Sequence, residues 1–210
     1  MNRRNYFKEL ERLIGKQEGR PSLLLHACCG PCSSGVLEYL TEHFDITILW
    51  YNPNLFPEEE FEKRYDALAE LLEKMGLKDT VPVIKEPWAS EDYYEAVRGL
   101  EDEPEGGERC KECFRVRLEK TARAAKEKGF DFFCTTLTVS RHKNAVLINA
   151  IGEHQAEMTG AVWLPSDFKK HDGENRAVEM SEKYGIYRQV YCGCEFSLIN
   201  RLKGKTNESP

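Results

Sequence analysis

Short apolar runs alternate with amphipathic segments along most of this chain, and this alternation constrains the fold more than any other feature. We expect buried strands at residues 22–27 (SLLLHA), 46–51 (ITILWY), 81–84 and 130–137, with 162–164 as a candidate fifth strand. Apolar residues at helical spacing predict helices at 6–14, 36–43, 61–75, 91–100, 110–128 and 145–158, with a last one after Glu195. The alternation predicts an α/β fold with one doubly wound parallel sheet, Rossmann-like in type.

The chain of 210 residues has room for one complete domain and is short for two. No internal repeat or long linker divides it, so we expect a single α/β domain over residues 1–210 with a cysteine-rich metal site. In such sheets, ligands bind beyond the carboxyl ends of the strands. The segments CCGPCSSG, YNPN and TTLTVSRHKN each follow an expected strand and should meet at that edge.

Charge and hydropathy bound the compartment and the partners. No window of about 18 uncharged apolar residues exists, so we expect no membrane span. Charged residues interrupt the first 20 positions, which argues against a secretion signal and predicts a cytoplasmic protein. The net charge of −6 excludes a generally basic nucleic-acid binder but leaves room for a local basic face.

Eight cysteines in a reducing compartment predict metal ligands or redox catalysts rather than structural disulfides. Seven of them fall into three groups, which packing alone does not explain: Cys28, Cys29 and Cys32; Cys110 and Cys113; Cys192 and Cys194. Cys134 stands alone within an expected buried strand, and we interpret it as a core residue.

The first group lies in HACCGPCSSG, a glycine- and proline-rich turn between a strand and a helix. The positive end of that helix would stabilise thiolates and favour an anionic ligand. Two alternatives stay open: a phosphate-binding loop with incidental cysteines, and a thiol–disulfide enzyme that uses the CxxC formed by Cys29 and Cys32. His26, just upstream, either faces the site or packs in the core.

The other two groups suit a shared metal site. Cys110 and Cys113 are three positions apart at a helix start, so they face one side. Cys192 and Cys194 flank one glycine, which disfavours an unstrained disulfide between them and leaves metal binding, a redox pair or a tail anchor. A 4Fe-4S cluster takes up to four thiolates. Our preferred ligands are Cys28 or Cys29, Cys110, Cys113 and one of the tail pair, which leaves thiols for a second metal or a redox pair.

Charged and aromatic residues near these motifs suggest nucleic-acid contacts. The cations that follow expected strands suit phosphate groups, although solvated surface charge is the usual reason for such short runs: Arg141, His142, Lys143, Lys169 and Lys170. Four aromatic residues either stack an unpaired base or belong to the core: Trp50, Tyr51, Phe56 and Trp163.

Taken together, the motifs resemble one known family. HACCGPC, YNPN, ERCKECFRVRL, CTTLTVSRHKN, SDFKK and YCGCEFS, in this order over about residues 23–197, resemble the cobalamin-independent epoxyqueuosine reductases, the QueH family. The resemblance implies a fold similar to PP-loop ATPase domains and reduction of epoxyqueuosine to queuosine at the wobble position of a tRNA. It also implies cluster chemistry at Cys28, Cys29, Cys110 and Cys113, with Cys32, Cys192 and Cys194 at the family's other cysteine positions.

That reaction needs two electrons, two protons and a polarised C–O bond. An external electron donor is therefore expected, and an open iron position, an additional iron or the Cys192–Cys194 pair would help the cluster, which normally passes one electron at a time. Iron would act as a Lewis acid on the epoxide oxygen. Asp167 and His142 are candidates for proton delivery.

Two other functions compete with this interpretation. An ATP-dependent tRNA sulfur-transfer enzyme shares the fold class and substrate type, but it needs an SGGxDS-like loop where this chain has CCGPCSSG. A zinc-stabilised RNA-binding module needs only four thiolates around a structural zinc.

Overall fold

A four-stranded parallel sheet forms the centre of the fold in the computed structural model, which describes residues 4–204. The strands lie in the order β3-β2-β1-β4 and comprise β1 (Ser22–His26), β2 (Asp45–Trp50), β3 (Val83–Lys85) and β4 (Phe132–Thr135). The chain first winds outward from β1 to β3 and then returns to place β4 on the other side of β1. The sheet is therefore doubly wound, as the sequence predicts, and its switch point lies between β1 and β4.

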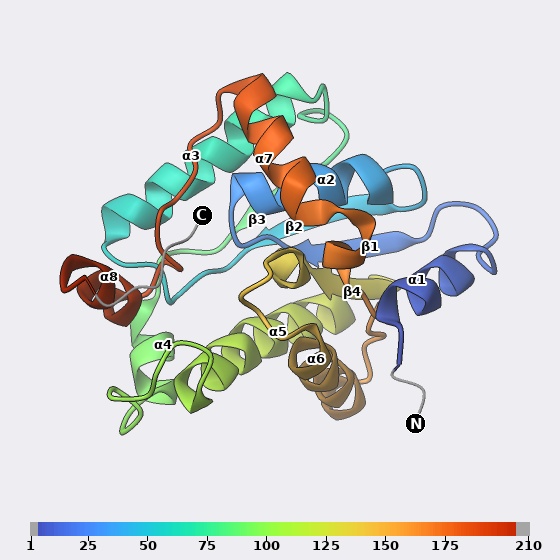
Figure 1. Cartoon of the computed structure of the whole chain (residues 1–210). Coiled ribbons are helices and arrows are strands. Elements are labelled where there is room, and N and C mark those ends of the chain that lie inside the picture. The colour runs from blue at the N-terminus through green and yellow to red at the C-terminus, as the bar shows by residue number, and fades with distance from the viewer. Residues whose placement is uncertain (1–3, 205–210) are drawn as a thin grey trace.

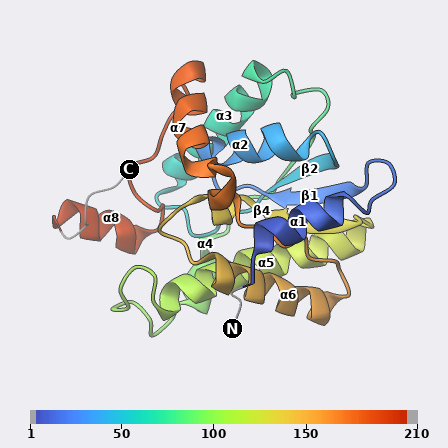
Figure 2. The same cartoon turned by 45° about the vertical axis from the view of Figure 1, so that its right-hand side comes forward.

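Helices cover both faces of this sheet (Figures 1 and 2). One layer contains α2 (Gly30–Leu40), α3 (Glu58–Lys74) and α7 (Gly173–Tyr184), and the opposite layer contains α5 (Glu108–Lys128) and α6 (Ala145–Thr159). Two covered faces explain why the strands are apolar at consecutive positions. Leu23 and Leu25 pack in the core under α2 and α3, whereas Leu24 packs with Leu118 of α5 in the other core.

Three further helices lie at the ends of the sheet. Figure 1 shows α1 (Tyr6–Ile14) at one end, and α4 (Ser90–Ala96) and α8 (Glu195–Leu202) together at the other. Short 3-10 helices follow β4 (Thr136–Val139) and precede α7 (Phe168–His171). No helix within residues 4–204 has both the length and the apolar character that crossing a membrane requires.

Most expected elements are present, and the differences have local causes. Residues 162–164 form one parallel bridge, from Trp163 to Phe133, and no strand. The next N–H on this side of the segment, that of Ser166, donates to the side-chain oxygen of Asn149 instead of to β4, so the pairing ends there. Helix α7 was not expected, because its buried residues are few and small, with Ala177 and Met180 the main apolar ones. The helix expected at 110–128 is confirmed, and Gly129 ends it in the left-handed conformation.

Candidate metal and thiol site

The residues after β1 and the first turn of α2 bring three thiols together at the switch point of the sheet. The helix expected at 36–43 in fact begins at Gly30, so most of CCGPCSSG is helical and not a turn. The sulfur atoms of Cys28, Cys29 and Cys32 lie within 4.8 Å of one another. Cys29 is the N-cap of α2, and its sulfur accepts the backbone N–H of Cys32 at 3.4 Å. Gly30 makes this turn possible because its Cα packs against α3, where a Cβ would lie 2.9 Å from the carbonyl oxygen of Ala67. We call these three cysteines the triad.

Two other segments donate hydrogen bonds to the triad. Thr136, which follows β4, donates its hydroxyl to the sulfur of Cys28 at 3.3 Å and accepts the Cys28 N–H at 3.1 Å. Gln189, from the C-terminal tail, donates its side-chain amide to the sulfur of Cys29 at 3.2 Å. The triad is thus held by three segments that are far apart in the sequence.

The three thiols share their charge unequally. Hydrogen bonds with Cys29 and Cys32 lower the pKa of Cys28 well below its usual value, and the positive charge of Lys143 adds to this shift. The hydrogen bond to Cys28 raises the pKa of Cys29 to about 12, and the same two neighbours raise the pKa of Cys32. The three thiols are thus coupled, and Cys28 is the member whose thiolate form the surroundings favour most.

The remaining four grouped cysteines gather beside the triad, around α4, α5 and α8. Cys113 and Cys194 are buried in one small cluster with Tyr93 and Val97. The sulfur of Cys110 accepts the N–H of Gly106 at 3.2 Å, and that of Cys194, the N-cap of α8, accepts the N–H of Ser197 at 3.4 Å. Burial raises the pKa of Cys113 to about 12 and of Cys194 to about 11. Among residues 4–204, only the triad is compact enough to surround a single ion, so the other four form a looser group.

Two cations lie between the triad and this looser group. Arg117 of α5 is buried and donates to the carbonyl oxygen of Cys113 at 3.0 Å and to its sulfur at 3.1 Å. Burial lowers the pKa of Arg117, but the charges of Cys113, Cys192 and Cys28 outweigh it and raise the pKa. Lys143 is half-buried, and burial likewise lowers its pKa, while Cys192, Cys28 and Cys32 raise it beyond the usual value. Both cations thus interact electrostatically with sulfur atoms of both groups.

The other predicted residues lie in varied surroundings. Asp167 is buried, and one of its carboxylate oxygens accepts no hydrogen bond, although the ammonium of Lys169 lies 3.3 Å away. Lys169 donates instead to the carbonyl oxygens of Thr138 and Lys143, each at 3.2 Å, so it fastens the loops beside the site. His142, Arg141 and Lys170 are exposed, and the Arg141 guanidinium lies 3.3 Å from Glu174. Their roles in proton delivery and phosphate binding stay predictions.

His26 and Cys134 are part of the core. His26 is fully buried, with Nδ1 2.8 Å from the Thr135 hydroxyl and Nε2 3.2 Å from the carbonyl oxygen of Tyr51, so Nε2 carries the proton. Burial lowers the pKa of His26 to about 3, which keeps the ring neutral. Cys134 is fully buried beside Ser166, as expected. Trp50 and Trp163 are also buried, which leaves Phe56 as the more accessible of the expected stacking residues.

Sequence reasoning missed four residues that shape this site: Arg64, Arg117, Thr136 and Gln189. The two arginines left a signal, because Arg64 and Arg117 follow Phe61 and Phe114 by three positions on otherwise apolar helix faces. A charge at such a position is buried and needs a specific partner. Gln189 left no signal, since its segment is irregular and its contact with Cys29 depends on the tertiary fold.

Comparison with known proteins identifies the family. The family model described as "Epoxyqueuosine reductase QueH" matches residues 23–200. The chain is 44% identical to the epoxyqueuosine reductase QueH of Streptococcus pyogenes over 90% of this chain and 75% of the relative. It is 41% identical to the epoxyqueuosine reductase QueH of Staphylococcus aureus over 94% of this chain and 85% of the relative. A U34-tRNA thiolase from Methanococcus maripaludis, solved with its [4Fe-4S] cluster, aligns with a TM-score of 0.46 at 15% identity over 95% of this chain and 71% of the thiolase, too distant for an inference. On the family model and these relatives, the chain belongs to the epoxyqueuosine reductase QueH family.

Proposed function

We propose that this protein reduces the epoxide of epoxyqueuosine to the alkene of queuosine at the wobble position of a tRNA in the cytoplasm. Family membership suggests the reaction, and the observation that carries the proposal is the triad at the switch point of the sheet. One epoxide, two electrons and two protons give one alkene and one water. The two electrons require an external electron donor.

The residues present fit an iron–sulfur cluster. The grouped donors are all thiols, the ligands that such clusters prefer, and the nearby charges of Arg117 and Lys143 would offset the negative charge of a thiolate-bound cluster. We propose a 4Fe-4S cluster, and an additional iron, held by ligands drawn from the seven grouped cysteines: Cys28, Cys29, Cys32, Cys110, Cys113, Cys192 and Cys194. When bound, such a group supplies electrons and a Lewis-acidic iron.

The remaining steps fall to the chain's own side chains. Arg141 and Lys170 are exposed and suit contacts with tRNA phosphates, which would position the anticodon without reading its sequence. The modified base has to leave the base stack to reach a buried thiol site, as is usual for enzymes that act on bases. Asp167, one of whose buried oxygens accepts no hydrogen bond, and His142 are the proposed proton donors.

The test is anaerobic purification followed by metal analysis and turnover of tRNA that carries epoxyqueuosine. We expect about four irons and four sulfides for the cluster, iron beyond that for a second site, and conversion to queuosine when a reductant is added. Cys29→Ser should abolish turnover. Cys134→Ala, a matched change at a buried cysteine outside both groups, should retain it. Colourless protein that holds only zinc, even after reconstitution with iron and sulfide, would contradict the proposal and favour the RNA-binding module.

A further inference from the structure

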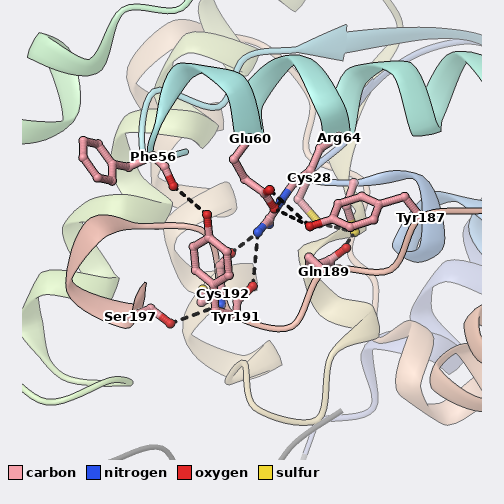
Figure 3. A network of polar contacts seen from close by, with 10 residues as sticks. Cys28, Phe56, Glu60, Arg64, Tyr187, Gln189, Tyr191, Cys192 and Ser197 are labelled. Carbon is pink, nitrogen blue, oxygen red and sulfur yellow. Dashed lines mark hydrogen bonds and ion pairs between the residues drawn. The ribbon is translucent and has the colours of Figure 1, made fainter. Parts of the chain in front are cut away.

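The irregular tail that carries Gln189, Cys192 and Cys194 lies along the first turns of α3 (Figure 3). It has no regular secondary structure from residue 185 to residue 194. All three of these side chains belong to the thiol site described above. The position of those side chains therefore depends on what holds the tail to α3.

Arg64 of α3 makes the central contacts. Its side chain is only 2% exposed and forms an ion pair with Glu60, one turn earlier, with 2.7 Å between Nε and Oε1. The two ends of the guanidinium donate to successive tail carbonyls, that of Cys192 at 3.1 Å and that of Tyr191 at 3.2 Å. The fork geometry of arginine allows both contacts at once, which a lysine cannot reproduce.

Further contacts close this arrangement around Arg64 (Figure 3). The hydroxyl of Tyr187 donates to both carboxylate oxygens of Glu60, each at 3.1 Å. The hydroxyl of Tyr191 donates to the carbonyl oxygen of Phe56 at 2.6 Å. The N–H of Phe56 in turn donates to the carbonyl oxygen of Gly193 at 2.9 Å. The tail is thus fastened on both sides of Gln189 and directly at Cys192.

Gly193 shows how closely the tail approaches. It has a φ of +124°, and a Cβ at this position would lie 2.9 Å from a guanidinium nitrogen of Arg64 and would also collide with Leu55. Only glycine avoids both the backbone strain and the collision. The residue between the two tail cysteines is therefore suited to direct packing against Arg64.

We infer that Arg64 is a positioning residue, which fixes the tail so that Cys192 and Cys194 are in place for the metal site before metal binds. A buried ion pair adds little to stability compared with apolar residues of the same shape, so holding a specific geometry is the better reason for it. The inference rests on the proposed function to the extent that the tail cysteines bind metal. Glu60 acts through Arg64 by orienting its guanidinium.

The first experiment measures thiol reactivity in the metal-free protein. Alkylation of Cys194, which is buried, is compared with that of Cys134 in the core by peptide mass spectrometry. Arg64→Gln removes two charge-assisted hydrogen bonds to the tail, so we expect Cys194 to react roughly 10-fold faster or more while Cys134 is unchanged. Arg20→Gln is the matched control, because Arg20 also pairs with a carboxylate and a carbonyl, but next to the start of β1.

The second experiment uses cobalt as a probe under anaerobic conditions. Thiolate-to-cobalt absorption is measured for the wild type, Arg64→Gln, Cys192→Ser and the double variant. If Arg64 positions Cys192, then Arg64→Gln loses the same absorption as Cys192→Ser, and the double variant loses no more. Arg64→Lys should fall between Arg64→Gln and the wild type.

Three results would overturn the inference. The first is an alkylation rate of Cys194 that Arg64→Gln leaves unchanged. The second is a rise in alkylation rate that Cys134 shares equally, which signals general unfolding. The third is a loss of cobalt absorption in the double variant that equals the sum of the losses in the two single variants. Failure of metal binding at the tail looks different. If Cys192 binds no metal, Cys192→Ser leaves the cobalt absorption intact, while the alkylation experiment still reports whether Arg64 holds the tail.

Discussion

Asn149 is fully buried in α6 and uses its whole side-chain amide to fasten the segment that leads to Asp167. Its nitrogen donates to the carbonyl oxygens of Ala145 at 2.8 Å and Ser166 at 2.7 Å. Its oxygen accepts the indole N–H of Trp163 at 3.1 Å and the backbone N–H of Ser166 at 3.0 Å. We predict that Asn149→Ala destabilises the protein strongly.

The magnitude follows from the groups that lose their partners. Removing the amide leaves two buried N–H donors unsatisfied, on Trp163 and Ser166, and each costs about 1–3 kcal/mol. A cavity of amide size adds to this loss. We therefore expect the free energy of unfolding to fall by about 3–5 kcal/mol.

Urea unfolding followed by circular dichroism measures this change. Asn175→Ala, the same substitution at an exposed site in α7, should cost less than about 0.5 kcal/mol. Asn149→Asp keeps the volume but turns an oxygen towards the carbonyls of Ala145 and Ser166, so it should also be destabilising without any cavity. A loss below about 1 kcal/mol for Asn149→Ala would show that water replaces the amide and would refute the reasoning.

Two further predictions concern charge. Arg117→Gln should shift the midpoint potential of the reconstituted protein to more negative values in a redox titration, because the positive charge beside the Cys113 sulfur favours the reduced form. Lys120→Gln is the control: Lys120 lies on the same helix but is paired with Glu86, so its loss should shift the potential less. The Ser22 hydroxyl and N–H donate hydrogen bonds to Asp131 and lower its pKa. The contribution of this carboxylate to the free energy of unfolding is therefore complete above its ordinary pKa of 3.8, and it is lost as the pH falls through the pKa in the folded protein. Asp131→Asn should therefore be less stable than the wild type at neutral pH, by less than about 1 kcal/mol because the carboxylate is exposed. In strong acid the two proteins should be equally stable, and a difference in stability that persists there would contradict this prediction.

The fold could be predicted wherever burial is continuous along the sequence. The run Leu23–Leu25 is apolar on both faces, and this requires helices on both sides of the sheet. Helix α7 escaped prediction because Ala177 and Met180 are the main apolar residues on the face that it buries, so this apolar face is short. Short sheet pairings such as that of Trp163 depend on the neighbouring strand, which no local pattern specifies.

The residue type at the candidate site could be predicted from the sequence, but the way its members group in space could not. Clustering in the sequence indicated seven functional cysteines, yet Cys32 was absent from the preferred ligand set although it completes the triad. Cys29 and Cys32 are three positions apart at a helix start, but this spacing does not say whether Cys32 turns towards Cys28 or away from it. That choice depends on Cys29 acting as the N-cap, which draws the N–H of Cys32 back onto the Cys29 sulfur.

Arg117, which is buried, and Lys143, which is half-buried, support the proposal that the sulfur atoms beside them carry negative charge. Within residues 4–204, no carboxylate lies within ion-pair distance of Arg117 or Lys143. Of the other buried arginines, Arg64 has Glu60, and Arg109 donates to the backbone carbonyls of Leu100, Glu101 and Glu103. A buried cation without a counter-charge is costly, and proteins rarely keep one. The charges that raise the pKa of both residues are those of Cys28 and Cys192, together with Cys113 for Arg117 and Cys32 for Lys143. Thiolates at these positions, which metal binding would produce, would therefore balance the charge of both cations.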